Sequence, residues 1–212
     1  MQVLKEEIRK KILETGKREF LEKGFQKTSM KKIAEGAGIK APTIYCYFRN
    51  KENLFLQLVE PVTTYFEGRR DRMEKADTLE LARSWGFEQR KEEYKQHMQF
   101  IGEHREEFQL LFSSAGGSSL ENYFDRLVME YEDIMKRILN ILKQAKVMET
   151  PVTDFFVHNM AAFYVTTLRE ASIQEVSKEE LDKFAEEWAL FRSEGWKELT
   201  CKKENNKGRN SK

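Results

Sequence analysis

The side chains best suited to bind a nucleic acid lie in residues 40–48, KAPTIYCYF. Lys40 offers a cation to phosphate, while Thr43 and Tyr45 offer hydroxyls to phosphates or base edges. In a helix with a period of 3.6 residues, one face would carry Ile44, Tyr47 and Phe48 inward. The opposite face would carry Lys40, Ala41, Thr43, Tyr45 and Cys46 outward. Cys46 could contact a thymine methyl or simply fill space.

The sequence lacks the residue spacings that are typical of a catalytic site or a metal site. The chain has no GxxxxGK[ST] or GxGxxG, and Gly116-Gly117 lacks the strand and lysine of a phosphate loop. His97 and His104 are seven residues apart, about 10 Å of helical rise, which is too far to share a metal ion. Cys46 and Cys201 have no CxxC spacing. We therefore expect no enzyme activity, no metal and no cofactor.

Residues 29–48 should form the helix-turn-helix that positions these groups. Ala34 is small where two crossing helices approach, and Gly38 provides the backbone freedom of a sharp turn. A stripe over residues 6–23 predicts a preceding helix that ends at Gly24, with Phe25 in the three-helix core. Small or apolar residues occupy the expected helix contacts: Met30, Ile33, Ala34, Ile39, Ile44 and Tyr47.

A fourth helix should follow, with Asn50 as its N-cap and Lys51 at its first position. Pro61 is expected to kink or interrupt this helix. A hydroxyl of Thr28 or Ser29 should cap the first helix of the helix-turn-helix.

Residues 38–54 resemble the TetR family of bacterial transcriptional regulators. The family motif, roughly G-[VI]-x-x-x-[TA]-[IL]-Y-x-[HY]-F-x-x-K-[ED]-x-L, is matched in register, and the resemblance covers about residues 6–66. The matching residues are Gly38, Ile39, Thr43, Ile44, Tyr45, Tyr47, Phe48, Lys51, Glu52 and Leu54.

The resemblance implies that the second helix of the pair enters a DNA major groove. It assigns phosphate contacts to Thr28, Lys40 and Tyr47, and sequence choice to Thr43, Tyr45 and the first turn of that helix. A phosphate contact is also expected for Lys51, because it lies beside the free N–H groups at a helix N-terminus. Relatives often carry Lys or Arg at the position of Ala41. The cation is displaced to Lys40 in this chain, so the resemblance does not decide which of the two touches a base.

Charge is unevenly distributed along the 212 residues, although the net charge is only +1. Residues 1–70 carry a net charge of +6, residues 71–200 carry −9, and residues 201–212 carry +4. A basic first third on an acidic body suits a chain that presents one end to phosphates. Helical surfaces in general carry many solvated charges, which would explain the number of charged residues but not their uneven distribution along the chain.

The fold is expected to be all-α, with a DNA-binding domain at 6–66 and a larger ligand-binding and dimerisation domain at 67–200. Helices are predicted at roughly 78–101, 103–114, 119–146, 152–175 and 178–197, with loops at 115–119 and 150–151. The tail 201–212 is polar and basic, and we expect it to be disordered. No stretch is apolar enough to be a membrane span or signal peptide, so a cytoplasmic protein is expected.

The segment FFVHNMAAFYVTTL, residues 155–168, is apolar on nearly every side, which implies a partner for its surplus face. The resemblance implies that the last two long helices form a homodimer, although a central helix of a monomer core is the alternative. The expected interface residues are Phe155, Phe156, Met160, Ala161, Phe163, Tyr164, Leu181, Phe184, Trp188 and Phe191.

A pocket for a small-molecule effector is also implied by the resemblance, although the same residues could make an ordinary core. Its candidate lining is Trp85, Tyr94, Met98, His104, Phe112, Tyr123, Phe124, Tyr131, Phe163 and Tyr164. The acidic body favours a neutral or cationic effector over an anionic one.

Together these features predict a homodimeric regulator, more often a repressor in such families, that binds a near-palindromic operator and is released by a small molecule. The alternatives are a helical protein-interaction module on the same fold, or a helical enzyme with an unrecognised site.

Overall fold

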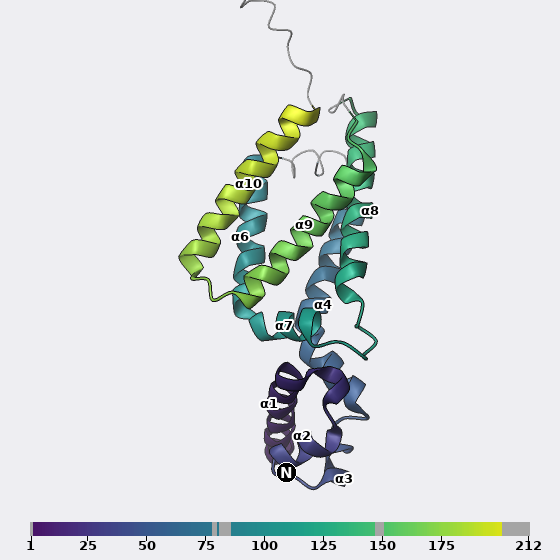
Figure 1. The fold of residues 1–212 in the computed structure, drawn as a ribbon, viewed down its shortest axis with the longest axis vertical. Coiled ribbons are helices and arrows are strands. Elements are labelled where there is room, and N and C mark those ends of the chain that lie inside the picture. The colour runs from purple at the N-terminus through teal and green to yellow at the C-terminus, as the bar shows by residue number, and fades with distance from the viewer. Residues whose placement is uncertain (1, 78–79, 81–85, 147–150, 201–212) are drawn as a thin grey trace, which may run out of the picture. The chain divides into compact units, whose positions relative to one another are not determined.

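The computed structural model describes residues 2–77, 80, 86–146 and 151–200, and every regular element within these ranges is a helix (Figure 1). The expected all-α fold is confirmed. The helices are α1 (Gln2–Lys27), α2 (Met30–Gly36), α3 (Ala41–Ile44), α4 (Lys51–Lys75), α6 (Phe87–Glu103), α7 (Arg105–Ser113), α8 (Tyr123–Gln144), α9 (Asp154–Ile173) and α10 (Lys178–Thr200).

Two predicted features, the start of one helix and the effect of Pro61, differ from the structure. Residues 119–122 were expected to open a helix, but the segment from Ala115 to Asn122 makes turns, in which the Ser118 amide donates to the Ala115 carbonyl at 2.9 Å. The helix α4 continues through Pro61 without the predicted interruption. Much of the predicted start of the 78–101 helix, and the tail 201–212, lie outside the described residues.

The chain divides into two compact units that interleave along the sequence. Unit 1 comprises residues 1–69, 101–127 and 168–175, and unit 2 comprises residues 70–100, 128–167 and 176–212. The predicted domain limits of 6–66 and 67–200 stay a prediction.

Aromatic rings fill the centre of unit 1. Phe25 lies 5.8 Å from Phe20 and 5.2 Å from Phe55 between ring centroids, and all three side chains are buried. Burying three phenyl rings stabilises this unit by several kcal/mol, at about 25 cal/mol per Å² of apolar surface. Phe25 is thus buried, as predicted for a core residue, and its ring contacts are with α1 and α4.

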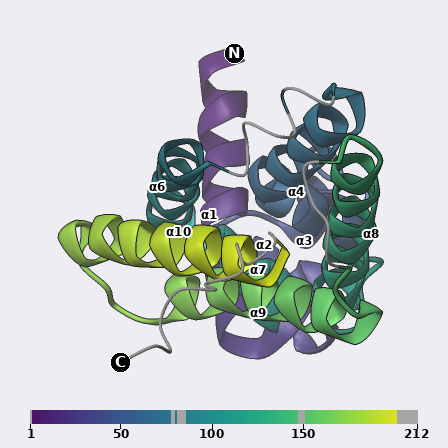
Figure 2. The same ribbon diagram turned by 90° about the horizontal axis from the view of Figure 1, so that it is seen from above.

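In unit 2, α9 and α10 pack along each other (Figure 2), as shown by the ring contacts Phe156–Trp196 at 5.4 Å and Phe163–Trp188 at 4.9 Å. The helix α6 contributes Tyr94 and His97 to the same interior, where the His97 Nδ1 and the Tyr164 hydroxyl lie 2.5 Å apart. None of the helices in the described ranges has both the length and the apolar character needed to cross a bilayer.

Candidate nucleic-acid interface

A glycine ends the regular part of α1. Gly24 has φ 75° and ψ 163°, a conformation that favours glycine, so the chain leaves the helical path there although helical turns resume briefly to Lys27. The predicted stop at Gly24 is therefore visible as a sharp kink. The amide of the next residue, Phe25, donates to the Ser114 carbonyl at 2.8 Å.

The two helices of the helix-turn-helix are joined as the sequence predicts. Ser29 is the N-cap of α2, and its hydroxyl accepts a hydrogen bond from the Lys32 amide at 3.3 Å. Gly38 has φ 71°, which a residue with a Cβ adopts only with strain, so the turn needs this glycine. Ala34 is completely buried beside the turn, and the Ile39 amide donates to its carbonyl at 3.0 Å.

One side of α3 and the turns after it is anchored in the core. Ile44 and Phe48 are fully buried, as predicted, whereas Tyr47 is half-buried. Arg9 from α1 lies over the Phe48 ring at 5.0 Å and donates to Gln57 at 2.6 Å. The anchored side therefore sets the rotation of α3.

The opposite side of α3 is open to solvent. Lys40 is its N-cap residue and is exposed, Tyr45 is 56% exposed, and Cys46 is exposed. Ala41 and Thr43 are half-buried. Every residue of the predicted outward set is thus exposed or half-buried, and we call this set the reading face: residues 40, 41, 43, 45 and 46.

Two more exposed cations lie near the reading face in the sequence, and the sequence analysis did not single them out. Lys32 on α2 and Arg49 after α3 are both exposed. The signal was present in the sequence as basic residues inside the helix-turn-helix.

Thr28 is placed in the core rather than at the surface. Its side chain is 3% exposed, and its hydroxyl donates to the carbonyls of Glu19 at 3.1 Å and Gly24 at 2.9 Å. These two contacts tie the kinked end of α1 together, and they face away from solvent. Its predicted phosphate contact is tested by nothing in this structure.

The ammonium of Lys51 is surrounded by backbone. It donates to the carbonyls of Phe25 at 2.6 Å, Thr28 at 2.9 Å and, more weakly, Gln26 at 3.4 Å. It also lies 4.2 Å from the centre of the Phe25 ring. Burial lowers the pKa of Lys51 from its ordinary value. In this arrangement the side chain adds a charged donor to the carbonyls at the end of α1.

The predicted cap of α4 is present. The side-chain oxygen of Asn50 accepts from the Asn53 amide at 2.7 Å, which satisfies one free donor at the start of the helix.

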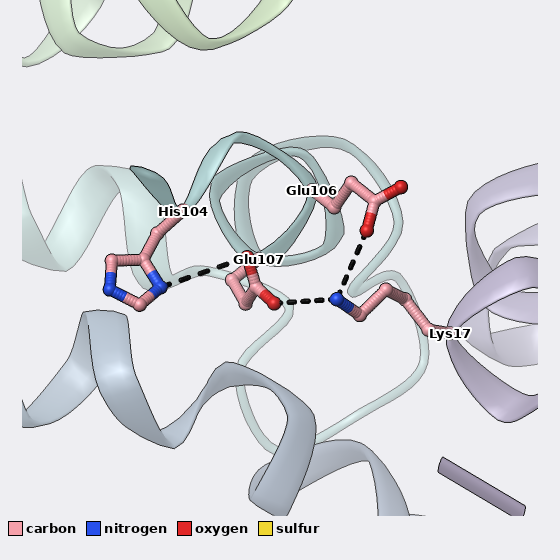
Figure 3. Close-up of polar contacts among 4 residues, drawn as sticks. All are labelled: Lys17, His104, Glu106 and Glu107. Atoms are coloured by element: carbon pink, nitrogen blue, oxygen red, sulfur yellow. Dashed lines mark hydrogen bonds and ion pairs between the residues drawn. The ribbon is translucent and has the colours of Figure 1, made fainter. Parts of the chain in front are cut away.

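An ion-pair cluster holds α7 to α1 within unit 1 (Figure 3). The Lys17 ammonium lies 2.7 Å from a carboxylate oxygen of Glu107 and 3.0 Å from one of Glu106, and His104 lies 3.9 Å from Glu107. Burial pulls the pKa of Lys17 down, but the hydrogen bonds and charges of both glutamates outweigh it and raise the pKa above its ordinary value. Sequence analysis missed this cluster because about ninety residues separate its members.

The turns after α7 also contact the start of α4. Glu52 at the start of α4 accepts from the Ser119 amide at 3.1 Å and from its hydroxyl at 2.6 Å. The side-chain amide of Gln109 on α7 donates a hydrogen bond of 2.8 Å to the carbonyl of Ser172, near the end of α9. Within unit 1, α7 therefore links the end of α9 to α1 and α4.

The residues predicted to line one pocket fall into two groups. In unit 2, Tyr164 lies 4.6 Å from Tyr131 and 6.1 Å from Tyr94 between ring centroids, and Met98 is buried. Phe163 is 49% exposed, and Trp85 lies outside the described residues.

The remaining pocket candidates belong to unit 1. Phe112 lies 5.9 Å from Phe124, and Tyr123 lies 6.4 Å from Phe66. His104 is the residue before α7 and belongs to the ion-pair cluster. The predicted effector pocket itself stays a prediction.

The predicted dimer residues divide by exposure. Phe155, Phe163 and Phe191 are exposed, and Phe156, Met160 and Phe184 are half-buried. The other four are turned into the chain's own interior: Ala161, Tyr164, Leu181 and Trp188. We call the exposed and half-buried six, which lie on α9 and α10, the dimer face.

Sequence comparison identifies the N-terminal part of the chain. Residues 12–58 match the model of the bacterial regulatory proteins of the tetR family. The HTH-type transcriptional regulator EthR of Mycolicibacterium smegmatis is 43% identical over 51 residues, which is 24% of each chain. The uncharacterized HTH-type transcriptional regulator YdgC of Bacillus subtilis is 36% identical over 53 residues, 25% of this chain and 27% of YdgC. Each alignment thus spans about a quarter of the relative's length.

Comparison of structures extends the likeness to the whole fold. The ketosteroid transcriptional regulator KstR2 of Mycobacterium tuberculosis superposes with a TM-score of 0.62 at 16% identity, covering 92% of this chain and 95% of KstR2. The fatty acid degradation regulator FadR of Bacillus halodurans gives 0.53 at 18% identity, covering 86% and 94%. At these identities the likeness concerns the fold alone. Residues 12–58 therefore match the tetR family of bacterial regulatory proteins, and most of the chain shares the fold of solved TetR-like regulators.

Proposed function

We propose that the chain is a sequence-specific DNA-binding regulator of transcription that acts as a homodimer and is released from its operator by a small molecule, most simply as a repressor. The observation that carries the proposal is the reading face, which is exposed and cation-led while Ile44 and Phe48 anchor the reverse side. Such a surface suits a short helix that enters a major groove. We place its action in the cytoplasm, on double-stranded DNA.

The reading face divides by chemistry. Lys40 would meet a phosphate, because its exposed ammonium leads the helix, and Thr43 and Tyr45 would meet base edges or phosphates. Lys32 and Arg49 would add phosphate contacts beside it. We assign Lys51 and Thr28 a positioning role, because their donors already hold the end of α1.

Homodimerisation would present two reading faces to successive major grooves, about 34–36 Å apart or a related spacing. The dimer face supports this step, since a surface with exposed Phe155, Phe163 and Phe191 is unusual for a monomer. An effector would act by binding better to a conformer whose two heads no longer fit the operator. The named roles of KstR2 and FadR in metabolism support an effector of some kind.

The test first identifies operator duplexes among the genomic fragments that the purified protein retains. The affinity of the protein for these duplexes is then measured by fluorescence anisotropy at several salt concentrations. Lys40→Ala should weaken operator and unrelated DNA alike and reduce the salt slope by about one. Tyr45→Ala should weaken the operator more than unrelated DNA, by about 5-fold to 100-fold.

Lys183→Ala is the matched control, because Lys183 is an exposed lysine on α10, in unit 2. It should leave both affinity and salt slope unchanged. If Lys40→Ala behaves like this control, the reading face does not bind DNA and the proposal fails.

A further inference from the structure

Two buried hydrogen-bond donors on α10 have no acceptor within the described part of the chain. They are the Nε of Arg192 and the indole Nε1 of Trp188, one helical turn apart. Trp188 is only 6% exposed. A buried N–H without an acceptor is rare and costly in a folded protein, so each calls for a physical explanation.

A second guanidinium lies close to the first. Arg192 donates to the Tyr94 hydroxyl at 2.6 Å, and Arg90, which is 5% exposed, also hydrogen-bonds to Tyr94. Burial lowers the pKa of Arg90, and the charge of Arg192 lowers it further, partly offset by Tyr94 and Glu93. The Tyr94 hydroxyl thus contacts both guanidiniums, whose like charges repel each other.

Aromatic rings lie next to these donors. The Arg192 guanidinium carbon lies 5.8 Å from the Trp188 ring and 6.0 Å from the Tyr94 ring. The Trp188 indole packs against Phe163 at 4.9 Å and Phe191 at 5.6 Å. The α6 and α10 helices that supply the cluster lie side by side in unit 2 (Figure 1).

From this cluster we propose that unit 2 binds an organic carboxylate whose two oxygens accept from Arg192 and Trp188 and whose apolar body lies among the aromatic rings. N–H donors without acceptors, next to a pair of guanidiniums, call for an anionic acceptor. Two open donors match the two oxygens of a carboxylate, and a dianionic phosphate would cost more to bring among aromatic rings.

The inference rests on the proposed function, because the carboxylate would be its effector. It reverses the expectation of a neutral or cationic effector, which followed from overall charge. Donors in direct contact with the ligand would outweigh the net negative charge of the acidic body, since exposed charges are screened beyond about 10 Å at ordinary salt.

Calorimetry on the full chain at pH 7.5 tests the inference with matched probes: benzoate, phenylacetate, octanoate and decanoate against the four corresponding amides. At least one carboxylate should bind at least about 10-fold more tightly than its amide, because the amide lacks the charge and one acceptor oxygen. The inference is overturned if each acid and its amide bind equally, if none of the carboxylates binds, or if phenyl phosphate binds more tightly.

Two substitutions locate the site. Arg192→Met keeps a long stem without the charge and should weaken the best carboxylate about 10-fold or more, while Trp188→Phe removes one N–H and should weaken it about 3-fold to 10-fold. Lys197→Met, an exposed lysine on the same helix, is the control and should change nothing. If Arg192→Met impairs folding by circular dichroism, Trp188→Phe decides. Unchanged carboxylate affinity in a folded Arg192→Met or Trp188→Phe variant would overturn the site.

Fluorescence anisotropy of a labelled operator, measured with and without the carboxylate, separates this inference from the proposed function. Carboxylate binding that releases the operator supports both. Carboxylate binding without operator release supports this site and refutes the effector step. Operator binding with no response to any carboxylate and no calorimetric signal refutes this site alone.

Discussion

The ammonium of Lys51 lies among three backbone carbonyls, and this environment limits what the side chain can do. A lysine at a helix N-terminus predicts a phosphate contact from sequence, since free N–H groups there favour anions. In the folded chain, the carbonyls at the end of α1 accept hydrogen bonds from the Lys51 ammonium, and they compete with a phosphate for it. Lys51 therefore helps to hold the conformation of the helix-turn-helix. Lys40, the other lysine predicted to contact phosphate, is exposed.

Lys51→Ala should lower the free energy of unfolding by about 1–3 kcal/mol, because it leaves the carbonyls of Phe25 and Thr28 without their charged donor. Thermal unfolding should show Tm falling by about 2–4 °C per kcal/mol. The salt slope of DNA binding should stay the same, in contrast to Lys40→Ala. A slope lowered by one with unchanged Tm would restore the phosphate role instead.

At the scale of elements, the α7 helix binds α1 through charge rather than apolar contact alone. Lys17 is 27% exposed and its carboxylate partner Glu107 is 15% exposed, so water screens the pair only partly. The same helix donates to residues near the end of α9 and is followed by the turns that contact Glu52. This makes α7 the element best placed to influence the angle of α1 and α4.

Lys17→Met should lower the free energy of unfolding by about 1–3 kcal/mol, since it leaves two glutamates without a cation at a partly buried contact. It should also change operator affinity without changing the salt slope, because Lys17 faces α7 and not the reading face. Urea unfolding and anisotropy measure the two effects.

Lys10→Met is the matched control on the same helix. Its pair with Glu14 is 3.9 Å long and exposed at 79% and 64%, so removing it should change stability by no more than about 0.5 kcal/mol. Equal effects of the two substitutions would mean that the contact with α7 adds nothing.

At the scale of the whole molecule, a basic N-terminal third and an exposed aromatic surface on α9 and α10 suit different partners. The first third carries a net charge of +6, which favours DNA. The dimer face favours a second copy of the chain, because two apolar helix faces can bury each other.

Phe191→Glu should convert the protein to a monomer at micromolar concentration, since a buried, unpaired carboxylate on each side of the interface is strongly unfavourable. Sedimentation velocity would show the change, and operator affinity should fall by more than 10-fold because one reading face replaces two. Phe191 is 62% exposed.

Met129→Glu on α8 is the control, because Met129 is 63% exposed but lies off the dimer face. It should leave the sedimentation coefficient unchanged. A wild-type protein that sediments as a monomer, or a Phe191→Glu protein that stays dimeric, would contradict the proposed dimer.

The sequence by itself determined the parts of this protein whose contacts are local. The cap by Asn50, the turn at Gly38 and the burial of Ile44 and Phe48 all depend on residues within a turn or two of each other. Helical periodicity and turn chemistry act over such distances, so the all-α fold and the helix-turn-helix could be predicted.

Only the tertiary structure decided which helix faces meet. The contacts of Lys17 with Glu106 and of Arg192 with Tyr94 join residues 89 and 98 positions apart, and no local pattern encodes them. The same holds for Lys51, whose carbonyl partners come from the far end of α1. A charged side chain takes its role from whichever neighbours packing brings to it, and packing depends on all helices at once.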